Sequence, residues 1–183
     1  MDVPISHILG TAALIGLVIS AALAYQIIVG YVETNVLKSQ LKQTAEYVSM
    51  NLVNLISLTE FAYGGLSTPS VMMKTLNLPK DLGEKPYLVR LVNESGKCYI
   101  KVELVTRSDL YAESPIPLNS TNARITIATE DVITRITADF PDDTITLSSV
   151  VYGGNPNIVV WCWKNTSDLI YTGLGSLTGG GTD

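Results

Sequence analysis

The chain has 183 residues, a net charge of −5, a mean hydropathy of +0.28 and 2 cysteines. Residues 62–183 carry 13 acidic and 10 basic side chains, and the basic ones are scattered singly, so a nucleic acid is not an expected partner. About 120 residues remain beyond the first sixty, which is enough for one compact domain and too few for two.

The first predicted element is one long helix over residues 1–61, whose first half is strongly apolar. Residues 3–32 contain no Lys, Arg, Asp or Glu. About thirty residues at ~1.5 Å each extend about 45 Å, which exceeds the ~30 Å hydrocarbon layer of a bilayer. This segment is therefore predicted to lie in a membrane or in the core of a filament.

A row of small side chains runs along this uncharged half. Its members, spaced four residues apart, are Ala12, Gly16, Ser20 and Ala24. Small residues let helix backbones approach closely in lipid, so the row predicts a seam at which helices pack together. The alternative is that the row only reflects the general richness of membrane helices in alanine and glycine.

The second half of the helix, residues 33–61, is amphipathic. Charged side chains appear there, while one face carries a stripe of mostly apolar residues at steps of three and four. The stripe consists of Leu37, Leu41, Ala45, Val48, Leu52, Leu55 and Thr59. Such a stripe needs a partner in water, and the rest of the chain is the nearest one, so we expect protein to cover it.

The remaining residues divide into a connector (62–86), a head (87–175) and a tail (176–183) that is expected to be flexible. Segments 87–93 and 98–106 alternate around Glu-Ser-Gly-Lys and predict a hairpin. Further strands are predicted at 123–129, 132–139, 144–152, 157–163 and 169–173. These short strands indicate a sandwich or barrel, and we favour an α+β chain with a small antiparallel, immunoglobulin-like β-sandwich head.

Both cysteines lie in the head. Cys98 and Cys162 fall on separate predicted strands, which predicts a disulfide in an oxidising compartment, with two buried free thiols as the alternative. Lys38 and Lys42 follow the apolar segment, and the positive-inside rule alone would place the head in the cytoplasm. The N-glycosylation sequons favour the outside instead. They begin at Asn93, Asn119 and Asn165.

No residue pattern indicates an enzyme, a cofactor or a metal site. The single histidine, His7, lies in the apolar segment, so the head lacks one for a His-dependent triad or a His-containing zinc site. Trp161 and Trp163 share one strand face, which favours core anchors over a binding surface. Five acidic residues could bind calcium if their loops converged, but solvated turn residues are the preferred interpretation. They are Glu130, Asp131, Asp139, Asp142 and Asp143.

The architecture and two short stretches resemble the archaeal type IV pilin-like superfamily, which includes adhesive pilins, archaellins and archaellum stator-like proteins. The stretches are Val-Pro-Ile-Ser-His-Ile-Leu-Gly-Thr at 3–11 and the connector from Leu-Pro at 78–79 to Tyr-Leu-Val at 87–89. The resemblance implies a leader cleaved between Gly10 and Thr11. Cleaved members usually carry Lys or Arg just before the small residue, whereas this chain has His-Ile-Leu. Stator-like members keep an uncleaved anchor.

Composition and resemblance together predict a structural, non-enzymatic subunit of an archaeal cell-surface appendage or of its envelope anchor. Its expected partners are the membrane and either copies of itself in a filament or sister pilin-like and surface-layer proteins. The expected location is the cell membrane with an extracellular head, or a surface filament. The alternative is a single-pass, membrane-anchored extracellular module that binds a ligand or a surface-layer partner.

Overall fold

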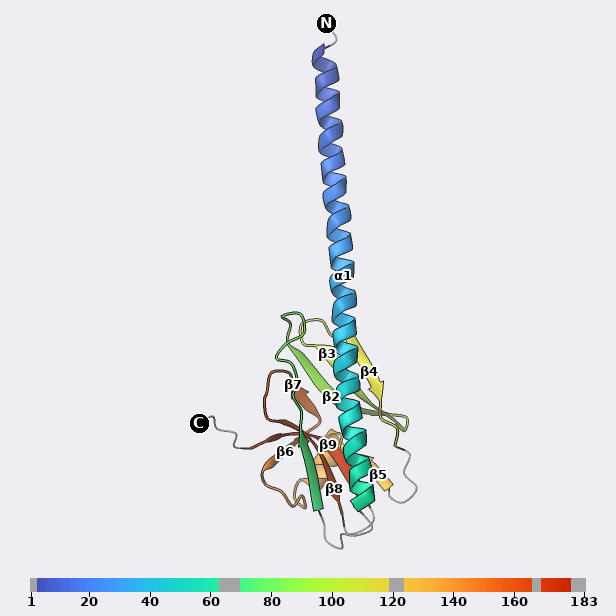
Figure 1. The fold of residues 1–183 in the computed structure, drawn as a ribbon, viewed down its shortest axis with the longest axis vertical. Helices are drawn as coiled ribbons and strands as arrows, with labels where there is room; N and C mark the ends of the chain where they lie inside the picture. The colour runs from blue at the N-terminus through green and yellow to red at the C-terminus, as the bar shows by residue number, and fades with distance from the viewer. Residues whose placement is uncertain (1–2, 63–69, 119–123, 166–168, 179–183) are drawn as a thin grey trace. The chain divides into compact units, whose positions relative to one another are not determined.

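A computed structural model describes residues 3–62, 70–118, 124–165 and 169–178 of this α+β chain (Figure 1). The chain divides into two compact units, residues 1–37 and residues 38–183. The described elements are α1 (Val3–Ala62), β1 (Ser70–Thr75), β2 (Tyr87–Glu94), β3 (Lys97–Leu104), β4 (Tyr111–Pro115), β5 (Arg124–Ile127), α2 (Glu130–Ile136), β6 (Ile145–Ser148), β7 (Val150–Tyr152), β8 (Ile158–Lys164) and β9 (Leu169–Leu177).

Helix α1 confirms the predicted long N-terminal helix. After Pro4, no proline interrupts it. Hydroxyl groups along its first 34 residues bond within the helix: Ser20 Oγ donates to the Gly16 carbonyl (2.8 Å), and Thr34 Oγ1 donates to the Gly30 carbonyl (2.9 Å). These polar side chains therefore need no partner outside the helix.

The predicted stripe on the second half of α1 is buried, which confirms that protein covers it. Its buried members are Leu37, Leu41, Ala45, Val48, Leu52, Leu55 and Thr59. Ser49 Oγ on the same helix donates to the carbonyl of Pro115 in β4 (2.7 Å), and Thr59 Oγ1 reaches Met72 Sδ in β1 (3.5 Å). From Lys38 onward, α1 thus contributes core side chains to the unit formed by residues 38–183.

One sheet has four strands in the order β4-β3-β2-β7. The predicted hairpin is confirmed, with β2 and β3 paired from Tyr87↔Leu104 to Glu94↔Lys97. Ser95 (φ 53°) and Gly96 (φ 80°) both take the left-handed conformation that a two-residue turn of this kind requires. Strand β4 is absent from the prediction because its five residues, Tyr-Ala-Glu-Ser-Pro, are short, polar and end in proline.

The other sheet has five strands and is mixed, which corrects the prediction of a purely antiparallel head; the immunoglobulin-like arrangement is not confirmed. Its path is β1-β8-β9-β5, and β6 also pairs with β9. Strand β5 runs parallel to β9, from Arg124↔Leu169 to Ile127↔Thr172. Partners more than forty residues apart along the chain leave no local sequence signal for this pairing.

Strand residues lie in the connector, where a short extended or helical piece is expected at 71–78, and in the predicted tail. The connector 62–86 includes β1, which lies along β8 from Ser70↔Lys164 to Thr75↔Val159. The tail 176–183 begins inside β9, where Leu177 pairs with Ile145. Backbone hydrogen bonds to neighbouring strands stabilise both segments as strands, although their residues have only a weak local preference for strand structure. Residues 179–183 lie outside the described residues.

The predicted strand over 132–139 is wrong, because residues 130–136 form helix α2. Two apolar side chains four apart, Val132 and Ile136, are buried on one helical face. Glu130 and Asp131 occupy the first turn, where the helix dipole favours negative charge. The β-branched residues of this segment favour a strand locally, and packing against the five-stranded sheet overrides that preference.

Strand β8 is buried on both faces, as its position between β1 and β9 predicts. Trp161 and Trp163 lie in one cluster with Val132 and Ile136 of α2. Phe140 meets both indoles edge-on, with ring centroids 5.1 and 5.6 Å apart. The two tryptophans are core anchors, which confirms the preferred interpretation.

Candidate functional site

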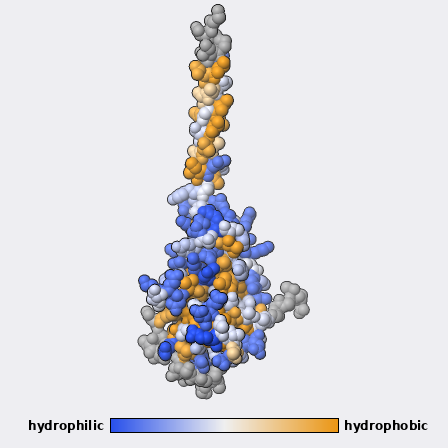
Figure 2. Space-filling model, turned by 180° about the vertical axis from the view of Figure 1, so that it is seen from behind, coloured by the Kyte–Doolittle hydropathy of each residue, from blue (hydrophilic) through white to orange (hydrophobic). Residues whose placement is uncertain are grey.

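The uncharged part of α1 is an apolar surface. Within the chain, its large hydrophobic side chains between Ile8 and Val32 are 44% to 73% exposed (Figure 2). By length and composition the helix could cross a membrane, so it is a candidate membrane anchor or signal sequence. So much contiguous apolar surface is unfavourable in water, and it requires lipid or other protein around it.

The four small residues of the predicted packing seam all lie on this exposed surface. An added side-chain atom at Gly16 would meet nothing within 4 Å, and the same holds for Gly10 and Gly30. The chain itself therefore imposes no steric need for small residues there. A requirement for them would have to come from contact with another molecule, and the seam stays a prediction.

The implied leader site lies within a regular part of the helix. Thr11 Oγ1 donates to the carbonyls of His7 (2.9 Å) and Ile8 (3.0 Å), and Gly10 is exposed. Cleavage after Gly10 would need this helical backbone to open so that a peptidase could bind it extended. The cleavage itself stays a prediction.

The cysteines do not form the predicted disulfide, because Cys98 and Cys162 are both free and buried. They belong to different sheets: Cys98 lies opposite Asn93 in the hairpin, and Cys162 lies opposite Met72 and Thr172 at the centre of β8. The Cys162 thiol donates to Thr172 Oγ1 (3.1 Å). Burial raises the pKa of Cys98, and burial raises the pKa of Cys162 to about 12. Neither is an activated nucleophile.

Thiol titration of the full chain tests this correction. Without reductant, two thiols per chain should react after denaturation, and native protein should react slowly because the raised pKa values leave little thiolate. Reductant should leave the melting temperature unchanged, since no bridge closes the loop of about 64 residues. Absence of reactive thiols, together with a lower melting temperature after reduction, would restore the disulfide.

The sequons differ in their surroundings. Asn93 is exposed at the end of β2. Asn165 follows β8, is partly exposed, and donates its backbone N–H to the Leu169 carbonyl (2.9 Å). Asn119 lies outside the described residues. Glycosylation at the three positions stays a prediction.

The acidic residues near α2 and β6 are engaged in local structure. Asp142 Oδ1 accepts a hydrogen bond from the backbone N–H of Thr144 (2.9 Å), which fixes the turn before β6. Across the described residues, no group of three or more His, Cys, Asp or Glu side chains is arranged to hold a metal ion. Asp142 therefore lies in a turn, as expected, whereas Glu130 and Asp131 belong to the first turn of α2.

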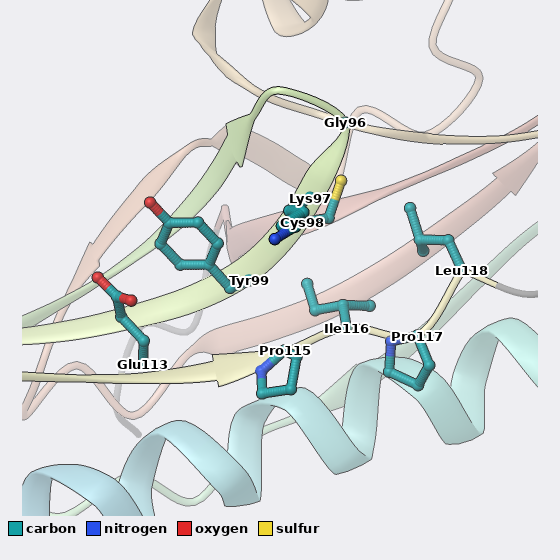
Figure 3. Close-up of a pocket in the computed structure, with 9 residues that line it drawn as sticks. All are labelled: Gly96, Lys97, Cys98, Tyr99, Glu113, Pro115, Ile116, Pro117 and Leu118. Carbon is teal, nitrogen blue, oxygen red and sulfur yellow. The ribbon is translucent and has the colours of Figure 1, made fainter.

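A hollow of 630 Å³ opens beside the β2–β3 hairpin (Figure 3). Its lining residues are Gly96, Lys97, Cys98, Tyr99, Glu113, Pro115, Ile116, Pro117 and Leu118. The Cys98 sulfur is directed away from Tyr99 and Glu113, so neither of these side chains adjoins the thiol. This hollow therefore does not assemble a nucleophile and a base.

The sequence interpretation missed a charged network on the outer face of the four-stranded sheet. The carboxylate of Glu103 binds Arg90 Nη2 (2.9 Å) and Lys101 Nζ (3.2 Å). Lys101 Nζ also lies 4.5 Å from the centre of the Tyr111 ring. The signal was present as polar residues alternating with the buried Val89, Leu91, Ile100 and Val102 along β2 and β3.

No protein-family model, curated protein or solved structure matches this chain.

Proposed function

We propose that this chain is a structural, non-enzymatic subunit of a cell-surface appendage or of its envelope anchor, of the archaeal type IV pilin-like kind. It assembles through its N-terminal helix with copies of itself or with sister subunits, and it presents the head outside the cell. The observation that supports this proposal is the exposed, uncharged part of α1, whose apolar side chains lack cover within the chain.

The length and pattern of this segment favour assembly over a lone anchor. A single span needs about twenty apolar residues with no patterned face. Here residues 3–32 are all uncharged, and a row of small residues lies along them. In a bundle of such helices, each apolar surface covers its neighbours, and the small residues permit close approach.

Two substitutions in the full chain test the proposal. Gly16→Glu should abolish filaments or complexes, because a charge would be buried among apolar helices without a partner. Ser20→Leu is compatible with lipid but too bulky for a close seam, so it should also impair assembly. Filaments are counted by negative-stain electron microscopy, and complexes are sized in mild detergent.

Val18→Leu is the matched control, because Val18 is exposed to 63% and lies about half a turn from the small-residue row. Gly16 has free space in the single chain, so thermal unfolding of the head should not change in any of the variants. If Ser20→Leu assembles like the parent, the seam is wrong. If the native protein is monomeric in mild detergent and forms no filament, the anchored binding module replaces this proposal.

A further inference from the structure

A second hollow, of 610 Å³, lies over the outer face of the four-stranded sheet, next to the start of α2. We call it the tyrosine cleft. It is lined by Tyr99 and Lys101 of β3, Tyr111 and Glu113 of β4, Arg90 of β2, and Asp131 of α2, among others. Segments from five elements meet there, although they lie far apart in the sequence.

Strand register brings the main side chains of the cleft together. Lys101 pairs with Arg90 on one side and with Glu113 on the other. Tyr99 and Glu113 rise from neighbouring strands on the same side (Figure 3). Burial, and then the nearby Glu94 carboxylate, raise the pKa of Tyr99 to about 12, so its hydroxyl remains protonated.

The charged network holds the floor of the cleft in place. Glu103 is buried and forms an ion pair with both Arg90 and Lys101. Lys101 is in turn held against the Tyr111 ring. A binding surface whose side chains are already fixed loses less conformational entropy when a ligand arrives.

The cleft also has hydrogen-bond donors. Arg90 and Lys101 line it, and their side chains are 43% and 26% exposed. Each cationic group has more N–H donors than its contact with Glu103 uses, so a ligand that brings acceptors can bind them. Hydroxyl and ether oxygens are acceptors that carry no charge.

The lining selects among classes of ligand. Its four carboxylates, of Glu94, Glu113, Glu130 and Asp131, outnumber its two cations, of Arg90 and Lys101, which disfavours phosphate, nucleic acid and acidic peptides. Its mainly polar lining disfavours a lipid tail. Arg90 and Lys101 disfavour a cationic ligand, because it would have to approach these two cations in the lining. A neutral ligand with many hydroxyl groups, and with apolar patches that pack on tyrosine rings, avoids both kinds of repulsion.

We propose that the tyrosine cleft binds a neutral saccharide. The sugar hydroxyls donate to the carboxylates and accept from Arg90 and Lys101, while Tyr99 and Tyr111 contact its C–H surfaces. The sugar has two possible sources: a surface polysaccharide of another body, or a glycan on Asn93, which also lines the cleft. This proposal stands whether or not the chain polymerises.

A printed array of neutral and anionic oligosaccharides tests the proposal. The probe is the full chain made in a host without N-glycosylation and purified in lauryldimethylamine oxide, whose head group contains no sugar. Neutral oligosaccharides should bind and sulfated ones should not. Tyr111→Ala and Arg90→Lys should each weaken binding about tenfold, the effect expected of a central contact. Arg90→Lys keeps the charge but replaces the planar guanidinium and its five N–H donors.

Tyr152→Ala is the matched control, because Tyr152 pairs with Leu88 at the β7 edge, is 59% exposed and does not line the cleft. It should bind like the parent. Unchanged melting temperatures show that the variants fold. The proposal is overturned if neutral oligosaccharides do not bind, if the two cleft variants bind like the parent, or if a lysine-rich peptide binds in their place.

The source of the sugar is settled with protein from a glycosylating host. If a glycan on Asn93 fills the cleft, this glycosylated protein should not bind the array, and Ser95→Gly should bind it, because this change removes the sequon at a residue that does not line the cleft and whose φ of 53° suits glycine. If the cleft serves an external polysaccharide, both forms should bind. Each outcome supports a saccharide site, and loss of binding in every form contradicts it.

Discussion

Leu52→Ala is expected to lower the free energy of unfolding by about 2–5 kcal/mol, the range for truncating a fully buried leucine. Leu52 is 0% exposed on the buried stripe of α1, between Val48 and Leu55. The smaller side chain loses apolar contacts and leaves a cavity that packed neighbours fill only in part. Both tryptophans of the chain lie on β8 in the core, so their fluorescence during denaturant titration in detergent reports the unfolding.

Leu58→Ala is the control for this measurement. Leu58 lies six residues further along the same helix and is 60% exposed. Its truncation changes helix propensity equally but removes no buried contact, so unfolding should change by less than about 0.5 kcal/mol. If both variants lose the same free energy of unfolding, burial of the stripe does not stabilise the fold.

The stripe is predictable because its residues recur at the 3.6-residue period of a helix. The segment is long, so this period repeats often enough to be recognised. The hairpin is predictable for a related reason: Ser95 and Gly96 supply a two-residue turn between alternating strands. Both features are local. Their signals are complete within one stretch of chain.

Features that depend on distant contacts were not predictable. The parallel pairing of β5 with β9 joins residues more than forty apart, and no turn marks it. Helix α2 resembles a strand locally and becomes helical where Val132 and Ile136 meet the sheet. The sequence places Cys98 and Cys162 on two predicted strands. Only the folded chain shows that these strands belong to different sheets.

The candidate sites follow the same division. The exposed helix surface is visible in the sequence as thirty uncharged residues. The tyrosine cleft is not, because its residues come from five separate elements whose register decides which side chains adjoin. Alternation along β3 shows that Tyr99, Lys101 and Glu103 share a face, but it does not show that Arg90 lies next to them.

Gly173→Ala is expected to destabilise the head by about 1–3 kcal/mol through overpacking. Gly173 of β9 lies opposite Trp161 of β8. An added Cβ would be 2.6 Å from Trp161 Cζ2 and 2.9 Å from Ala128 Cβ. The indole cannot easily give way, because it is fully buried and its Nε1 donates to the Leu174 carbonyl (2.8 Å).

A double-mutant cycle isolates this contact. Trp161→Phe removes Cζ2, the atom nearest the new methyl group, and is itself destabilising because it leaves a cavity and removes the hydrogen bond to the Leu174 carbonyl. In the Trp161→Phe background, Gly173→Ala should lower the free energy of unfolding by less than it does in the parent. The coupling energy between the two positions should be about 0.5–3 kcal/mol. Denaturant unfolding of the parent, both single variants and the double variant provides the four values. If the two costs are additive, the requirement for glycine comes from the strand backbone or from Ala128 and not from the indole.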